Sequence, residues 1–190
     1  MKKIELVYKK ILDELIENQN KVFTQSNIAK TLKISLSTVN HALSSLKQMN
    51  AIKVKPNSFE IVSPKKILFY WASIRNVEKD IIYKTRYSFE VAQIEKNMPE
   101  EITFAAYSAY KFLFKDMPAD YSEVYVYTNN LKEIKKRFPE TKNEPNLFVL
   151  KKDFDKMSQS LLFVDLWNLK QWYAKDCLNA MEKKFYGILA

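Results

Sequence analysis

A chain of 190 residues has room for two modest domains, and 47% hydrophobic against 28% charged residues excludes intrinsic disorder. The single cysteine, Cys177, excludes an internal disulfide and any multi-cysteine metal site. Gly187 is the only glycine, which excludes the glycine-rich loops that hold the phosphates of nucleotide cofactors. We therefore expect no cofactor and no bound metal.

The net charge of +9 is concentrated in the N-terminal third of the chain. Residues 1–66 hold 12 Lys and Arg against 5 Asp and Glu, whereas residues 67–190 hold 19 against 17. Such a local excess is typical of a surface that binds phosphates. Neither a signal peptide nor a run of about 18 apolar residues is present, so we expect a cytoplasmic protein without a membrane segment.

The spacing of apolar residues predicts three helices before residue 51. The first covers 3–17 and is amphipathic, and the second is capped by Thr24. The third begins after Ser35 and runs to about Asn50. Between the second and third helices, Lys33 stands where a helix-turn-helix most often has glycine for a left-handed turn.

A β-hairpin is predicted after the third helix. Apolar residues alternate in 51–55 and 59–62, and Pro56-Asn57-Ser58 between them is a turn sequence. Ser63-Pro64 then closes the module, because proline and the residue before it both resist helix. We therefore predict a winged helix-turn-helix DNA-binding domain over residues 1–66.

The third helix is predicted to read DNA with the face opposite its apolar stripe. Short polar donors and acceptors suit the edges of bases in a major groove, and lysines on the hairpin suit flanking phosphates. The predicted DNA-binding residues are Ser35, Ser37, Thr38, Asn40, His41, Ser44, Lys47, Lys53 and Lys55. The alternatives are a soluble helix with a serine-rich outer face, and lysines that protect an edge strand from aggregation.

The run from Phe23 to Val62, in particular FTQSNIAKTLKISLSTVNHALSSLKQMNAIKV, resembles the winged helix-turn-helix regulators of the MarR type. This resemblance implies a winged-helix fold and a role in transcription regulation.

In the remainder of the chain, residues 67–190, expected strands and helices alternate. This alternation predicts a small mixed-sheet α/β domain. The expected strands are 80–87, 102–105, 123–128 and 147–150, and the expected helices are 66–72, 88–97, 106–114, 131–138 and 167–186. The segment 161–164 fits either type. We expect this domain to bind a partner, a ligand or another subunit.

The segments EVYVYTNNLKEIKKRF, PNLFVLKKDF and LLFVDLWNLKQWYAKDCLNAMEKKF resemble the C-terminal region of AbiEi-type abortive-infection antitoxins. The resemblance implies an N-terminal winged helix that represses its own operon, a toxin as a protein partner, and a C-terminal fold related to nucleotidyltransferases. We expect that fold to be inactive in this chain, because the carboxylates and the Gly-Ser turn that nucleotidyl transfer needs are not convincingly present.

Acidic residues raise the question of catalysis. Asp153 and Asp155 have the spacing of a metal pair, yet no Gly-Ser turn precedes them and lysines surround them, so a solvated loop is the favoured interpretation. We expect Asp165 to stabilise the start of the last helix.

Two further groups of side chains have alternative interpretations. The aromatic residues form either core or the lining of a ligand or partner pocket, and they are Tyr107, Tyr110, Phe112, Phe114, Trp167, Trp172 and Tyr173. The basic run on the helix 131–138 is either a second nucleic-acid surface or a solvated face, and it comprises Lys132, Lys135, Lys136 and Arg137.

Three functions fit these features. We favour a sequence-specific transcription regulator, a repressor or antitoxin-like autoregulator, that binds double-stranded DNA as a homodimer and is not an enzyme. A nucleotidyltransferase with an attached DNA-binding module is the alternative. A non-regulatory adaptor that binds protein or RNA is the third.

Overall fold

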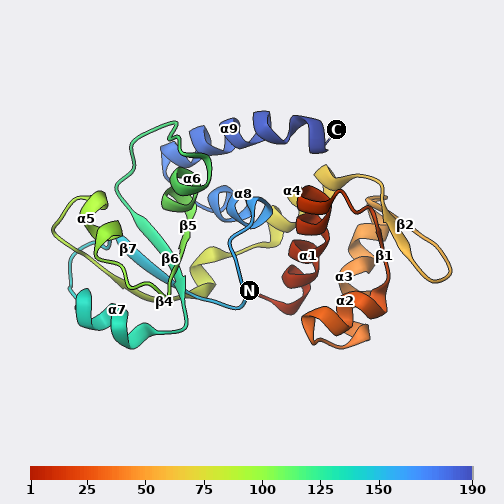
Figure 1. Ribbon diagram of the computed structural model, residues 1–190, viewed down its shortest axis with the longest axis horizontal. Coiled ribbons are helices and arrows are strands. Elements are labelled where there is room, and N and C mark those ends of the chain that lie inside the picture. Colours follow the sequence, from red (N-terminus) through yellow and green to blue (C-terminus); the bar gives the residue numbers. More distant parts are fainter. Residues whose placement is uncertain (190) are drawn as a thin grey trace. The chain divides into compact units, whose positions relative to one another are not determined.

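The computed structural model describes residues 1–189 and has a mixed α/β fold, as predicted (Figure 1). Within those residues the chain forms nine α-helices, a three-stranded antiparallel sheet and a four-stranded mixed sheet. The chain divides into two compact units. The first contains residues 1–75 and 158–164 and the chain from 182 onward, and the second contains 76–157 and 165–181.

The first unit contains the predicted winged helix. Its elements are α1 (Lys3–Asn18), β1 (Val22–Phe23), α2 (Gln25–Leu32), α3 (Leu36–Gln48), β2 (Ile52–Val54), β3 (Phe59–Ile61) and α4 (Pro64–Ile74). The hydroxyls of Thr24 and Ser35 cap α2 and α3 by accepting hydrogen bonds from backbone N–H groups. The predicted order of three helices and a hairpin is thus confirmed.

The sheet of the winged helix has one strand more than the sequence predicts. β1 pairs antiparallel with β3, which also pairs with β2, so the strand order is β1-β3-β2. Only Phe23 of β1 is buried, where its ring stacks on Phe59 at 5.6 Å between centroids. Two residues are too short to show the alternation that identifies a strand.

The core of the first unit lies between α1, α3 and α4. Val7, Ile11 and Val39 are fully buried, and the hydroxyl of Tyr8 donates a 3.1 Å hydrogen bond to the carbonyl oxygen of Ala42 on α3. The buried residues of α3 recur at three- and four-residue spacing and so lie on one face of the helix. The opposite face of α3 is exposed.

A buried polar group joins the start of α1 to the end of α4. Glu5 accepts a 3.2 Å hydrogen bond from the indole N–H of Trp71 and forms a 3.4 Å ion pair with Arg75. The Glu5 and Arg75 side chains are 2% and 1% exposed. The ion pair stabilises both buried charges, since an unpaired charge in a protein interior has a high desolvation free energy.

The second unit is built on the mixed sheet. Its elements are η1 (Val77–Asp80), β4 (Ile81–Thr85), α5 (Val91–Lys96), β5 (Thr103–Ala105), α6 (Ala106–Phe114), β6 (Val124–Thr128), α7 (Leu131–Arg137) and β7 (Leu147–Lys151). The strand order is β4-β7-β6-β5, in which β6 and β7 are parallel and both outer strands are antiparallel to their neighbours.

The two faces of this sheet are covered differently. One face packs on α5 and α7 through a cluster that includes Val126, Val149, Ile94 and Ile134. On the other face, Tyr125 contacts Tyr107 of α6 edge-on, and Figure 1 shows α6 and α7 on opposite sides of the strands. On the β4 and β7 part of this second face, Lys84 is exposed and Phe148 is half-buried.

The C-terminal helices differ from the prediction. Instead of one helix over 167–186, α8 (Gln159–Trp167) and α9 (Trp172–Leu189) are separated by a short turn. Asp165 therefore lies near the end of α8, is 2% exposed, and accepts a 2.8 Å hydrogen bond from the hydroxyl of Tyr127. The predicted capping role of Asp165 is wrong, because the residue belongs to a buried polar pair.

Some of the predicted core aromatic residues are buried and others are exposed, and the single cysteine is buried. Tyr107, Tyr110 and Tyr173 are buried, whereas Trp167 and Trp172 are 43% and 69% exposed, so these two tryptophans are not core. Cys177 is buried, and burial raises the pKa of its thiol to about 12. No helix among residues 1–189 is both long and apolar enough to cross a membrane.

Candidate nucleic-acid interface

The outward face of α3 carries most of the predicted DNA-binding side chains. Val39, Ala42, Leu43 and Leu46 are buried, and the residues on the opposite face are exposed. The exposed predicted residues of α3 are Ser37, Asn40, His41, Ser44 and Lys47. Because they recur at three- and four-residue spacing, they form one continuous stripe along the helix.

Hydroxyl groups gather at the N-terminus of α3. The Ser35 hydroxyl lies 2.9 Å from that of Ser37 and 2.8 Å from that of Thr38, and it also accepts from the Thr38 backbone N–H at 3.2 Å. Thr38 is half-buried, and its hydroxyl takes part in this cap. Ser35 and Ser37 are exposed beside the positive end of the helix dipole, which favours an anion such as a phosphate.

The turn between α2 and α3 is left-handed although it lacks glycine. Lys33 adopts φ 52° and ψ 43°, and its backbone N–H reaches back to the carbonyl oxygens of α2. The conformation expected of the usual glycine is thus made by a lysine, at a cost of about 1 kcal/mol. Lys33 and Lys30 are both exposed and place positive charge beside the start of α3.

The wing lysines differ from each other in their partners. Lys55 forms a 2.8 Å ion pair with Glu60, which lowers the pKa of the Glu60 carboxyl. Lys53 lies opposite Glu60 in the hairpin register, is exposed, and makes no hydrogen bond or ion pair within residues 1–185. Lys53 is therefore the wing residue that is better placed to contact a phosphate.

Two exposed residues of α3 were not predicted. Gln48 is exposed on the α3 stripe one turn after Ser44, and the helical period alone would have identified it. Leu36, at the first position of α3, is 53% exposed, which apolar patterning had no reason to suggest. Lys66, which follows the wing, is exposed and donates a 2.8 Å hydrogen bond to the carbonyl oxygen of Met49 at the end of α3.

The remaining candidates lie in the second unit and do not form a comparable surface. Asp153 and Asp155 follow β7 in a loop, and within residues 1–185 no three His, Cys, Asp or Glu side chains are grouped as metal ligands would be. On α7, Arg137 pairs with Glu133 at 3.1 Å, and Lys135 lies over the ring of Tyr83 at 5.2 Å. Part of that basic run is thus engaged within the protein.

Comparison with known proteins identifies one family. A family model described as Firmicute plasmid replication protein (RepL) matches residues 1–97, which include the whole winged helix and extend into the second unit. No curated protein and no solved structure matches the chain.

This match overturns both resemblances drawn from the sequence. The chain is not identified with MarR-type regulators, because the spacing of a winged helix-turn-helix is shared by many DNA-binding proteins of different function. The AbiEi-type resemblance is likewise wrong, because it depended on apolar residues that any buried strand or helix supplies. The antitoxin role and the toxin partner were implied by that resemblance and are dropped with it, and repression of transcription stays a prediction that the match does not support.

Proposed function

The chain belongs to the RepL family of Firmicute plasmid replication proteins, and we propose that it acts in plasmid replication by binding double-stranded plasmid DNA. In this proposal α3 enters the major groove and the wing contacts the flanking backbone. The proposal assigns the chain a binding role and no catalytic step.

The outward face of α3 is the observation that carries this proposal. Its exposed side chains are short hydrogen-bonding groups, with Asn40 and His41 near the middle of the stripe. Surface helices that only face solvent are usually rich in Glu and Lys, since serine and asparagine favour helix less. An asparagine on such a face can pair with the donor and acceptor of an adenine edge.

The charge around α3 supports the same conclusion. Exposed lysines lie on α2, in the turn after it, on α3 and in the wing, and they are Lys30, Lys33, Lys47 and Lys53. Residues 1–66 contain only 5 acidic residues. Lysines that contact phosphates release counterions, so binding should weaken steeply with salt.

We extend the proposal to a homodimer on two half-sites, because a single recognition helix contacts few base pairs. The stoichiometry of the complex tests this extension separately from DNA binding itself.

The test is binding of duplex fragments that tile the replicon carrying the gene, measured by fluorescence anisotropy at fixed salt. We expect one fragment to bind more tightly than the rest, and Asn40→Ala to weaken that binding by about tenfold or more while leaving the other fragments unchanged. Asn179→Ala, which changes an exposed asparagine of α9, is the matched control.

Lys53→Ala separates backbone contact from base contact. It should weaken binding to all fragments alike and reduce the slope of log affinity against log salt by about 1. Equal affinity for all fragments, unaffected by Asn40→Ala, would show that α3 does not read the sequence of the DNA.

A further inference from the structure

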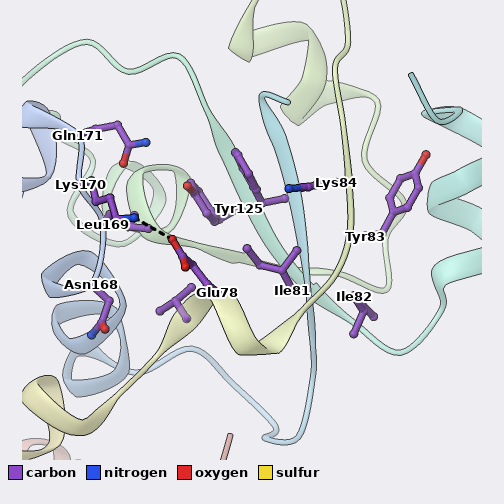
Figure 2. A pocket seen from close by; sticks show the side chains of 12 residues that line it. Glu78, Ile81, Ile82, Tyr83, Lys84, Tyr125, Asn168, Leu169, Lys170 and Gln171 are labelled. Atoms are coloured by element: carbon purple, nitrogen blue, oxygen red, sulfur yellow. Dashed lines mark hydrogen bonds and ion pairs between the residues drawn. The ribbon is translucent and has the colours of Figure 1, made fainter. Parts of the chain in front are cut away.

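The second unit contains a cavity of about 600 Å³ over the open part of its sheet (Figure 2). Its floor is formed by side chains of β4, β6 and β7, and its walls by η1 and by the turn 168–171 between α8 and α9. A volume in this range is typical of sites for small ligands.

Three side chains form a row across the floor. Tyr125 on β6 is the register partner of Phe148 on β7, which is in turn the partner of Lys84 on β4. The rings of Tyr125 and Phe148 stack at 4.6 Å, with planes 10° apart. Because neighbouring partners in register point to the same face of a sheet, the cavity is floored by two stacked rings with a cation beside them.

Phe148 is the accessible member of the stack. Tyr125 is 5% exposed, whereas Phe148 is half-buried and lines the cavity. Tyr125 covers one side of the Phe148 ring, Lys84 is its neighbour on β4, and the exposed part of the ring lines the cavity. An aromatic ligand placed there would continue the stack, since offset stacking of rings is favourable.

The charge of the cavity favours an anion next to that ring. Lys84 is exposed and makes no hydrogen bond or ion pair within residues 1–185. Lys170 forms a 3.1 Å ion pair with Glu78, drawn as a dashed line in Figure 2. Their side chains are 84% and 72% exposed, and exposed pairs of this kind are weak, so Lys170 can exchange Glu78 for a ligand anion.

We propose that this cavity binds a nucleotide, with the base stacked on Phe148 and the phosphate held by Lys84 and Lys170. A nucleotide combines a flat aromatic base with an anionic phosphate a few bonds away. These two groups complement the stacked rings and the lysine of the floor. Stacking on an aromatic side chain accepts any base, so the site would have little sequence preference. Free nucleotide and a nucleotide within a single strand share this chemistry.

Isothermal titration calorimetry with dAMP, deoxyadenosine and deoxyribose phosphate measures the two contributions separately. We expect dAMP to bind at least about tenfold more tightly than deoxyribose phosphate, which lacks the base. Phe148→Leu should remove that difference. Lys84→Ala should weaken binding of dAMP several-fold and leave binding of deoxyadenosine, which lacks the phosphate, unchanged.

Two further variants sharpen the test. Glu78→Gln should strengthen dAMP binding, because it removes a competing anion from Lys170. Lys142→Ala, which removes an exposed lysine of the loop before β7, is the matched control for Lys84→Ala and should change nothing. Lys84 is exposed, so its variant keeps the test decisive even if Phe148→Leu fails to fold.

Anisotropy with labelled oligo(dA) identifies the source of the nucleotide. Tighter binding of oligo(dA) than of dAMP, weakened by Lys84→Ala, indicates single-stranded DNA, and the reverse order indicates free nucleotide. The proposal would be overturned if dAMP did not bind and if Phe148→Leu and Lys84→Ala left oligo(dA) binding unchanged. Equal affinity for dAMP and deoxyribose phosphate would also overturn it. Asn40→Ala should leave dAMP binding intact, so this site and the duplex site fail independently.

Discussion

The outer face of α3 and the open face of the second sheet are two surfaces of opposite construction. On α3 most of the exposed side chains are polar, they come from one helix, and buried residues on its other side fix their direction. On the sheet the side chains of the row are aromatic and cationic, with Tyr125 buried, Phe148 half-buried and Lys84 exposed, and they come from strands that are far apart in the chain. The first surface depends on a helical period, the second on strand pairing.

The two surfaces are supported by different parts of the molecule. The direction of α3 depends on its cap and on the packing of α1 and α4 in the same unit. The sheet face depends on the register of three strands and on the buried pair between Tyr127 and Asp165. Changes to these supports should damage one surface and leave the other intact.

The largest effect is expected at the buried ion pair of the first unit. Glu5→Gln removes the buried carboxylate that forms an ion pair with Arg75 and accepts a hydrogen bond from Trp71, so the free energy of unfolding should fall by about 3 kcal/mol in urea denaturation. Exposed Glu100→Gln is the control and should change the free energy of unfolding little. A loss below about 1 kcal/mol for Glu5→Gln would mean that the pair does not support α1 and α4.

A smaller effect is expected at the support of the sheet. Tyr127→Phe removes the hydroxyl that donates to Asp165, and a lost hydrogen bond to a buried charged group costs about 2 kcal/mol. Tyr87→Phe is the control, because the Tyr87 hydroxyl has no hydrogen-bond partner in the described part of the chain. Equal thermal midpoints for the two variants would contradict this role of Tyr127.

The smallest effect is expected at the cap of α3. Ser35→Ala removes the acceptor of the Thr38 backbone N–H and should lower the free energy of unfolding by about 1 kcal/mol. Ser37→Ala, at an exposed neighbour that caps nothing, should be nearly neutral. If the two variants lower the free energy of unfolding equally, the contact between the Ser35 and Ser37 hydroxyls, and not the cap, stabilises the start of α3.

The winged helix could be predicted from sequence because its signals are local. Thr24 and Ser35 precede their helices, and the apolar period of α3 separates buried from exposed residues without knowledge of the rest of the chain. Thr38 shows the limit of that reasoning, since the same period does not reveal that its hydroxyl turns back to Ser35.

The second unit could be predicted only in outline. Its strands were located within a few residues, but the row from Tyr125 to Lys84 arises from pairings between distant segments, which no local pattern encodes. Asp165 was misplaced for a related reason: the apolar run before it fits a strand and a helix equally well, so the end of α8 was taken for the start of α9.

The scarcity of glycine has a consequence for how the protein tolerates change. Five non-glycine residues between 1 and 189 have positive φ, and two of them, Gln19 and Lys115, are the C-caps of α1 and α6. Each holds about 1 kcal/mol of backbone strain, partly offset because a chain with a single glycine is stiffer when unfolded. Glycine at Gln19 or Lys115 would relieve this strain. Such a substitution could therefore offset a loss of stability elsewhere in the chain without changing a residue of either surface.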